Sequence, residues 1–324
     1  MTKPKIGLFV PLRPDNHLQL DLSATAVGCL WADIHTPLLY ALRSAEGVEL
    51  VEDLNIHEAL IHDGRIYCGD VCLNELDRFF WYSEVDRRPG SFDLEVLHTL
   101  ARSVAVIRKP DRFETALDKF RAHQCLREAG VPVAESVLFD HRVPRRMTQV
   151  LEEWGAAVLK PRRGGWGKGV TLIDSAASLR DVIGYVRSTA GHAPDHGFFL
   201  ERYYENDPAH WASITMINGE IAYGYRKTSA RFHDFGQGRL KVQDLEQKGG
   251  GVVLADLTSR HKEMAHQAFE AMGLGLIGFD MIMTPQGPIV VDENTSPGNY
   301  PELYAQVGKD AAGMFARWIL TGQE

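Results

Sequence analysis

Two aspartates and an asparagine near the C-terminus have the spacing of metal ligands on paired strands. Asp280 and Asp292 each follow an apolar run, and residues 284–288 between them read as a turn, so antiparallel pairing is expected. Alternate residues of a strand share a face, which groups Asp292 with Asn294 and turns Glu293 the other way. Three converging oxygen ligands suit Mg²⁺. A solvent-exposed acidic hairpin end is the alternative interpretation.

A second candidate site is the glycine-rich segment 160–170, which has basic residues at both ends. Glycines let backbone N–H groups wrap a polyphosphate, and lysines offset its charge. The segment is not a Walker A loop, because Arg162 stands where the first glycine belongs and Gly169 where Ser or Thr should follow the lysine. It is not a dinucleotide fingerprint either, since it leads into a strand-like run instead of a helix. We interpret it as a flap that closes over phosphates; a long glycine turn with basic flanks is the alternative.

Composition excludes several classes of protein. The chain has 324 residues, 44% of them hydrophobic and 24% charged, which is typical of a globular protein with two or three domains. The formal net charge of −8 argues against a broad nucleic-acid or anionic-membrane surface. No apolar run is long enough to span a membrane or serve as a secretory signal.

The four cysteines point to a reducing compartment. They show no Cys-x-x-Cys pairing and no histidine at zinc-ligand spacing. We interpret them as reduced thiols of a cytoplasmic protein, with a structural disulfide as the lesser alternative.

The first third of the chain alternates strands and helices, as an α/β unit does. Strands are expected at 5–10, 48–51 and 104–107, helices at 36–43 and 93–103, and a hairpin at 56–73 that turns at Asp63-Gly64. The expected N-terminal domain comprises residues 1–110.

From Pro110 the pattern of strands and helices changes. Helices are expected at 112–129, 145–154, 176–188, 258–272 and 305–321, and strands at 135–139, 156–160, 170–173, 197–202, 211–217, 220–226, 277–283 and 288–294, with a polar loop at 227–251. Two further domains are expected, at 111–200 with the flap and at 201–324 with the metal site.

The order of these motifs resembles the ATP-grasp superfamily, within it the glutathione synthetase and ribosomal-protein-modifying, RimK-like group. The resemblance covers roughly residues 86–320. Segment 86–95 resembles the stretch ahead of the nucleotide-binding core, and Asp118-Lys119 with residues 130–133 resembles its entry. Segment 200–204 is similar to the interdomain hinge and 294–298 to the family's Asn-x-Thr-Ser-Pro ending.

The resemblance implies a fold and a set of site residues. The implied fold is α/β: an N-terminal domain followed by a two-part ATP-grasp core with antiparallel sheets. The implied ATP-binding residues are Lys119, Lys160, Gly164, Gly165, Gly167, Lys168, Gly169, Glu201, Arg202 and Tyr203. Asp280, Asp292 and Asn294 would bind two Mg²⁺ ions, with Mn²⁺ as an alternative. Lys160 and Arg226 would be catalytic, Arg226 by stabilising an acyl phosphate.

Some positions depart from the family pattern. Asp292 replaces the usual glutamate, which leaves open whether Glu293 joins the metal site. No Asp-x-Arg precedes the central strand, so Glu205 or Asp207 is the candidate ribose ligand.

The resemblance implies an ATP-dependent carboxylate–amine ligase that forms an amide through an acyl phosphate and releases ADP. Substrates would be small amino-acid or peptide-like molecules, contacted by Arg13, Arg231, Asn299 and Tyr300. A homodimer or homotetramer is expected, with neither nucleic acid nor membrane as a partner. A small-molecule kinase and a non-catalytic Mg-ATP-binding regulatory protein are the alternatives.

Overall fold

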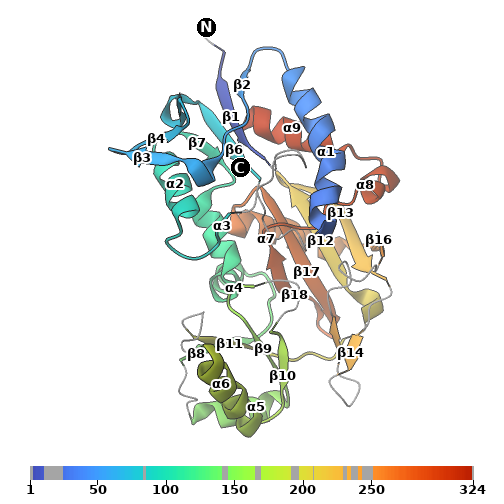
Figure 1. Cartoon of the computed structure of the whole chain (residues 1–324). Helices are drawn as coiled ribbons and strands as arrows, with labels where there is room; N and C mark the ends of the chain where they lie inside the picture. Colours follow the sequence, from blue (N-terminus) through green and yellow to red (C-terminus); the bar gives the residue numbers. More distant parts are fainter. Residues whose placement is uncertain are drawn as a thin grey trace.

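A computed structural model of the chain describes residues 3–10, 25–82, 85–140, 145–164, 169–190, 197–206, 208–228, 232–234, 240–242 and 251–322 (Figure 1). The following paragraphs concern these residues.

The N-terminal part is built on a four-stranded parallel sheet. Its order is β2 (Glu49–Val51), β1 (Lys5–Phe9), β6 (Arg78–Trp81), β7 (Ala105–Ile107). Helices α1 (Thr25–Arg43) and α9 (Ala311–Thr321) cover one face and α2 (Phe92–Leu100) covers the other (Figure 1). β6 is missing from the expected strands, because a strand buried on both faces has no alternating pattern to reveal it.

A small antiparallel sheet next to α2 confirms the predicted hairpin. It has the order β3 (Leu60–His62), β4 (Arg65–Cys68), β5 (Val71–Cys72). Asp63 and Gly64 turn the chain with φ of 48° and 77°, the left-handed conformation that two-residue hairpin loops require.

The middle of the chain forms a four-stranded antiparallel sheet, here called the flap sheet. Its order is β10 (Thr171–Ile173), β9 (Ala157–Lys160), β11 (Phe198–Arg202), β8 (Ser136–Phe139). Helices α5 (Arg146–Trp154) and α6 (Ala176–Ala190) pack on it around a hydrophobic cluster of its own. The glycine-rich segment joins β9 to β10, as predicted.

The C-terminal part is a five-stranded antiparallel sheet, here called the large sheet. Its order is β16 (Val252–Leu254), β13 (Glu220–Lys227), β12 (Ala212–Ile217), β17 (Leu276–Thr284), β18 (Gly287–Asn294). α7 (Ser259–Met272) packs on one face, and α8 (Pro301–Gln306) and α9 on the other.

One expected long helix, 112–129, is two helices in the structure. α3 (Pro110–Leu117) ends at Asp118, whose extended backbone starts α4 (Lys119–Glu128). The Asp118 carboxylate accepts the Arg121 N–H as an N-cap, which is the conformation aspartate favours over a mid-helix position. The prediction of one helix was wrong because apolar periodicity continues across the break.

Two other expectations about elements were wrong. The expected C-terminal helix, 305–321, is interrupted between α8 and α9, where Gly308 has a φ of 67° and Asp310 starts the next helix. The expected polar loop, 227–251, contains a two-stranded pair, β14 (Phe232–Asp234) and β15 (Leu240–Val242). Short polar strands carry little hydrophobic patterning, so the sequence did not reveal this pair.

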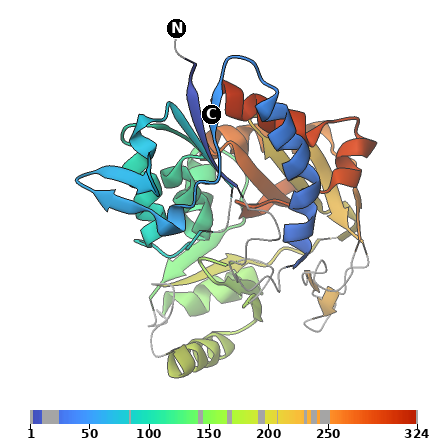
Figure 2. The same ribbon diagram turned by 45° about the horizontal axis from the view of Figure 1, so that its top comes forward.

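The three main sheets have a simple arrangement. In both views the flap sheet with α5 and α6 lies at one end, and the other two sheets lie side by side at the other end (Figures 1 and 2). One hydrophobic cluster joins the N-terminal sheet and α2 to α4, α7 and the large sheet. The architecture is the expected combination of an α/β unit with antiparallel sheets. None of the described helices is long and apolar enough to cross a lipid bilayer.

Candidate functional site

The two acidic strands pair as the sequence predicts. β17 and β18 are antiparallel, with Asp280 opposite Asp292. The carboxylate of Asp280 is hydrogen-bonded to Ser213 and Asn294, so Asp280 and Asn294 meet on one face of the sheet. The side chain of Glu293 is fully buried on the opposite face. Glu293 therefore faces away from the candidate metal ligands. The sequence left open whether Glu293 joins the metal site, and this position argues against it.

The electrostatics of this face favour a cation. Burial raises the pKa of Asp280, and the negative charge of Asp292 raises it further. The charge of Lys227 and hydrogen bonds with Ser213 and Asn294 lower the pKa, but they do not outweigh burial. Burial also acts to raise the pKa of Asp292, but Lys119 and Lys160 outweigh it and hold the pKa below its usual value. Two neighbouring carboxylates and an amide oxygen form a donor set that fits Mg²⁺. Among the described residues no group of three or more His, Cys, Asp or Glu could hold a metal, so the asparagine is needed.

Both predicted lysines contact β18, the strand that carries Asp292, from other elements of the fold. Lys119, in the first turn of α4, donates to Asp292 Oδ1. Although burial opposes its charge, the carboxylates of Asp292 and Glu293 raise the Lys119 pKa. Lys160 ends β9; its Nζ lies 2.5 Å from Glu201 Oε2 and donates to the Val291 carbonyl at 2.8 Å. Val291 is the extra residue of a β-bulge, which turns this carbonyl out of the regular ladder.

Beneath the lysines lies a buried group of titratable side chains. His123 Nε2 of α4 lies 3.7 Å from Glu201 and 3.7 Å from Glu293. Burial lowers the His123 pKa to about 4, against the raising effect of Glu201. Burial also raises the pKa of Glu293 well above its ordinary value. Sequence analysis did not identify His123, because a histidine on a helix gives no sign of the carboxylates that surround it.

We expect His123 to make the protein less stable in mild acid. An unfolded histidine titrates near pH 6.5, so protonation favours unfolding as pH falls from about 6.5 toward 4, by up to about 3 kcal/mol. Glu293, with its raised pKa, acts in the opposite direction. The contribution of His123 is therefore measured by urea unfolding of the unmodified protein and His123→Gln between pH 7 and 4. Equal pH dependence in both proteins would contradict this prediction.

The stem of the flap is tied to the start of α4. Asp118 is fully buried and accepts from Arg162 Nε at 3.1 Å and Nη2 at 2.5 Å, and from Arg163 Nη2 at 3.1 Å. The Lys119 N–H donates to the Arg162 carbonyl at 3.0 Å. These contacts hold the end of β9 beside the lysine that meets Asp292.

Replacing Asp118 with alanine is expected to destabilise the protein by about 3 kcal/mol. The variant leaves two partly buried arginines without their shared carboxylate and removes the cap of α4. Denaturant unfolding would measure the loss. Asp310→Ala is a matched control, because Asp310 starts α9 without a side-chain capping bond. An equal loss in both variants would show that the arginine contacts add nothing.

The predicted hinge lies at the end of β11, beside Lys160. Glu201 is buried and pairs with Lys160. The Arg202 and Tyr203 N–H groups donate to the Glu135 and Ala156 carbonyls, at 2.8 and 3.0 Å. These contacts hold the strand exit in place.

The structure does not bring Arg226 to the acidic face. Arg226 is exposed, and its side chain alternates with those of its neighbours on β13. Lys227 is the residue whose charge acts on Asp280. Alternation along β13 could have suggested Lys227, but only the pairing of β13, β12 and β17 shows which face meets Asp280.

Two predicted substrate residues are buried in the fold. Asn299 bonds to the hydroxyls of Tyr82 at 3.4 Å and Tyr304 at 2.9 Å. Tyr300 packs in the core beneath α8 and α9, and its N–H donates to Tyr223 Oη at 2.9 Å. In the described structure both residues hold the loop after β18, which makes direct substrate contact a less favoured role for them.

The remaining predicted residues divide into two groups. Gly164 and Gly169 flank the flap, and Gly169 has a φ of 74° with no room for a side chain beside Pro161. Glu205 is exposed beyond β11. Arg13, Gly165, Gly167, Lys168, Asp207 and Arg231 lie outside the described residues.

A buried arginine not identified from the sequence supports the loop after β18. Arg108 lies 4.5, 4.9 and 4.8 Å from the ring centroids of Trp81, Tyr82 and Phe113, and its Nη2 donates to the Thr295 carbonyl. Gly278 allows the loop to approach, since a Cβ there would lie 2.7 Å from Pro297. Arg108 and the close approach at Gly278 thus position the loop that follows Asn294.

Comparison with known proteins gives a consistent result. A family model described as "RimK-like ATP-grasp domain" matches residues 116–319. A "Probable alpha-L-glutamate ligase" of Xanthomonas oryzae pv. oryzae (strain MAFF 311018) is 27% identical over 64% of this chain and 66% of its own, just under two thirds. A "Ribosomal protein bS6--L-glutamate ligase" of Escherichia fergusonii is 26% identical over 70% of this chain and 69% of its own.

A solved structure shows the same fold over the whole chain. The "ATP-grasp ligase PsnB complexed with minimal precursor, Mg, and ADP" aligns with a TM-score of 0.61 and 16% identity, covering 100% of this chain and 99% of that one.

Proposed function

The chain belongs to the RimK-like ATP-grasp family, and from this premise we propose that it is an ADP-forming carboxylate–amine ligase. One observation carries the proposal: Lys119 and Lys160 converge on Asp292, and Asp292 pairs with Asp280 on the same sheet. The two lysines can bind the ATP phosphates, and the two carboxylates can bind Mg²⁺.

We propose that Lys119 and Lys160 bind the ATP phosphates. In the described structure both ammonium groups contact carboxylates, which offset their charge. Phosphate oxygens would take over these contacts as charge-assisted hydrogen bonds. The stem of the flap, at the end of β9, is held beside Lys119 by Asp118.

The candidate metal ligands are Asp280, Asp292 and Asn294. These residues would hold Mg²⁺, whose charge would offset the negative charge of the phosphates during transfer. Support comes from the raised pKa of Asp280 and from the relative solved with Mg and ADP. Two ions, with Mn²⁺ as an alternative, stay part of the proposal.

The chemistry proposed for the site is positioning and electrostatics. A substrate carboxylate attacks the γ-phosphorus of ATP, which gives an acyl phosphate and ADP. An amine then displaces phosphate from the acyl carbon. Lys227, near Asp280, replaces Arg226 as the candidate cation for the developing negative charge.

The curated relatives are named for ligation of L-glutamate, and one is named for a ribosomal protein. We propose an amino-acid or peptide-like substrate pair, with L-glutamate as the first amine to test. An acceptor at a protein C-terminus fits the same chemistry. A cytoplasmic location and a homodimer or homotetramer stay predictions.

An ADP-release screen over the twenty amino acids, alone and in pairs, tests the ligase proposal. Mass spectrometry of each mixture should show an amide product that forms together with ADP. A stable phosphorylated product would indicate a kinase, and no turnover with any pair would contradict a ligase of free amino acids. The Asp292→Asn protein is the control for contaminating ATPases.

A further inference from the structure

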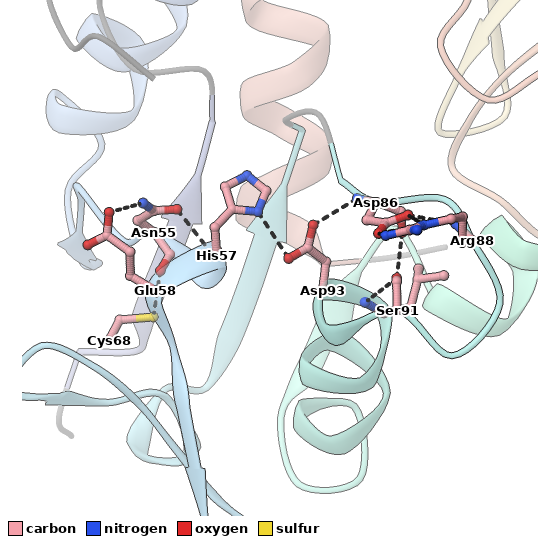
Figure 3. A network of polar contacts seen from close by, with 9 residues as sticks. Asn55, His57, Glu58, Cys68, Asp86, Arg88, Ser91 and Asp93 are labelled. Carbon is pink, nitrogen blue, oxygen red and sulfur yellow. Dashed lines mark hydrogen bonds and ion pairs between the residues drawn. The ribbon is translucent and has the colours of Figure 1, made fainter. Parts of the chain in front are cut away.

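A histidine–aspartate pair lies at the carboxyl edge of the N-terminal sheet. His57 is in the short helix η1 (Ile56–Glu58), which comes after β2, and Asp93 is in the first turn of α2, which comes after β6. His57 Nδ1 lies 3.0 Å from Asp93 Oδ1 (Figure 3). In open parallel sheets, ligands bind outside the carboxyl ends of the strands. The pair is therefore placed where a substrate would enter.

Asp93 determines which nitrogen of His57 carries the proton. Asp93 Oδ2 accepts the Asp86 N–H at 2.7 Å, and the Asp93 side chain is only 9% exposed. A carboxylate oxygen accepts hydrogen bonds, so the tautomer that fits this contact donates from Nδ1 and leaves the lone pair on Nε2. Figure 3 shows Nε2 turned away from Asp93, and no described residue hydrogen-bonds to it. The His57 side chain is 23% exposed, so this nitrogen can meet a ligand.

The residues around the pair hold it in one geometry. Asn55 Oδ1 accepts the His57 N–H at 3.2 Å and caps η1. The ring packs edge-on against Phe9 at the end of β1, with 5.2 Å between centroids. Ser91 caps α2 and donates to the Asp86 carbonyl at 2.5 Å (Figure 3). A base that is already oriented in this way loses little freedom when it acts.

The same edge of the sheet contacts the loop that follows the candidate metal strand. Three contacts join them: Arg87 to Ser296 Oγ at 3.5 Å, Tyr82 to Asn299 at 3.4 Å, and Arg108 to the Thr295 carbonyl. Arg87 is the next residue after Asp86, whose N–H binds Asp93. The segment that holds Asp93 therefore contacts the loop that follows Asn294.

We propose that His57, oriented by Asp93, is the base that deprotonates the amine substrate. The inference rests on the proposed ligase activity and assigns its second step. An aliphatic amine is an ammonium ion at neutral pH, with no lone pair for attack. Among the described groups at this edge of the sheet, His57 Nε2 has the free lone pair that this step requires.

The proton and electron balance of the step is simple. One ammonium proton passes to His57 Nε2, and the freed nitrogen lone pair forms the bond to the acyl carbon. The carbon–oxygen bond to phosphate then breaks, and phosphate leaves with that electron pair. The second amine proton goes to the departing phosphate. His57 returns its proton to solvent, to which the ring is partly exposed.

The test compares two nucleophiles for one acyl phosphate. Hydroxylamine is largely unprotonated at neutral pH and needs no base, so its hydroxamate product reports the activation step alone. Each of the twenty amino acids is first offered as the carboxylate with hydroxylamine, and the best is then paired with each as the amine, L-glutamate first. In His57→Asn the ratio of amide rate to hydroxamate rate should fall at least about tenfold. Asp93→Asn should lower the same ratio, because the wrong tautomer becomes available.

His98→Asn is the matched control. It removes a histidine–carboxylate pair of similar exposure, His98 Nε2 to Glu114 Oε2 at 2.7 Å, which joins α2 to α3. Its ratio should stay within about twofold of the unmodified protein, below the tenfold effects of acid–base groups. In His57→Ala, added imidazole should restore amide formation selectively, which also guards against a misfolded variant.

The outcomes separate the two proposals. An unmodified protein that forms neither hydroxamate nor amide would overturn the ligation of free amino acids and the inference with it. Hydroxamate formation in the unmodified protein, together with an unchanged ratio in His57→Asn, would overturn the role of His57 alone. A proportional loss of both rates without imidazole rescue would show a structural pair.

Discussion

Asp292→Asn is expected to lower ATP turnover about a thousandfold or more while the protein still folds. The change removes the charge that pairs with Lys119 and, in the proposal, binds the metal. Glu293 and Glu201 remain near Lys119 and still offset its buried charge, so cooperative unfolding should persist. ADP release measured over a Mg²⁺ titration, together with a urea unfolding curve, checks both parts of the prediction.

Glu263→Gln is a suitable control for this variant. Glu263 makes an exposed pair with Arg260 on α7 and should tolerate the same chemical change. Normal turnover in Asp292→Asn would remove Asp292 from the metal site. Loss of folding would assign it a structural role instead.

Lys160→Met should weaken ATP binding between about tenfold and a hundredfold. The Lys160 ammonium group contacts Glu201 and the Val291 carbonyl. In the proposal, an ATP phosphate takes the place of these two partners. A hydrogen bond to a charged group contributes about 1.5–3 kcal/mol, and each 1.4 kcal/mol is about tenfold in affinity. Displacement of a fluorescent nucleotide gives the dissociation constant directly.

Lys160→Arg and Lys262→Met sharpen the interpretation. The arginine keeps the charge and should recover part of the affinity, although its planar group cannot copy the ammonium geometry. Lys262 is an exposed residue of α7, so its methionine variant should bind ATP normally. If Lys160→Met also bound ATP normally, Lys160 would be only a structural partner of Glu201.

The candidate site draws on three parts of the fold. Lys160 comes from the flap sheet, Lys119 from α4, and the carboxylates from the large sheet. Asp118 links the first two through Arg162, and Arg108 links the N-terminal sheet to the loop after β18. A shift of Arg162, at the end of β9, would therefore change the position of Lys119, which contacts Asp292.

Local patterns in the sequence predicted much of the fold and of the candidate site. The spacing of Asp280, Asp292 and Asn294 predicted their shared face, because side-chain alternation on a strand is a property of the backbone. The glycine-rich segment was correctly placed between two strands. The resemblance to the ATP-grasp superfamily was confirmed by the family match. The domain boundaries and the roles of the site residues stay predictions.

The sequence by itself determined the family, through the order of several local motifs, and the acidic face, through the alternation of side chains along a strand. Tertiary structure alone decided that the charge of Lys227 and not of Arg226 acts on Asp280, that Asp118 binds Arg162, and that His57 pairs with Asp93. These contacts join segments as much as 53 residues apart (280 − 227), and their geometry follows from strand order and helix packing. No local pattern encodes such contacts, because they form only when separate elements pack into one core.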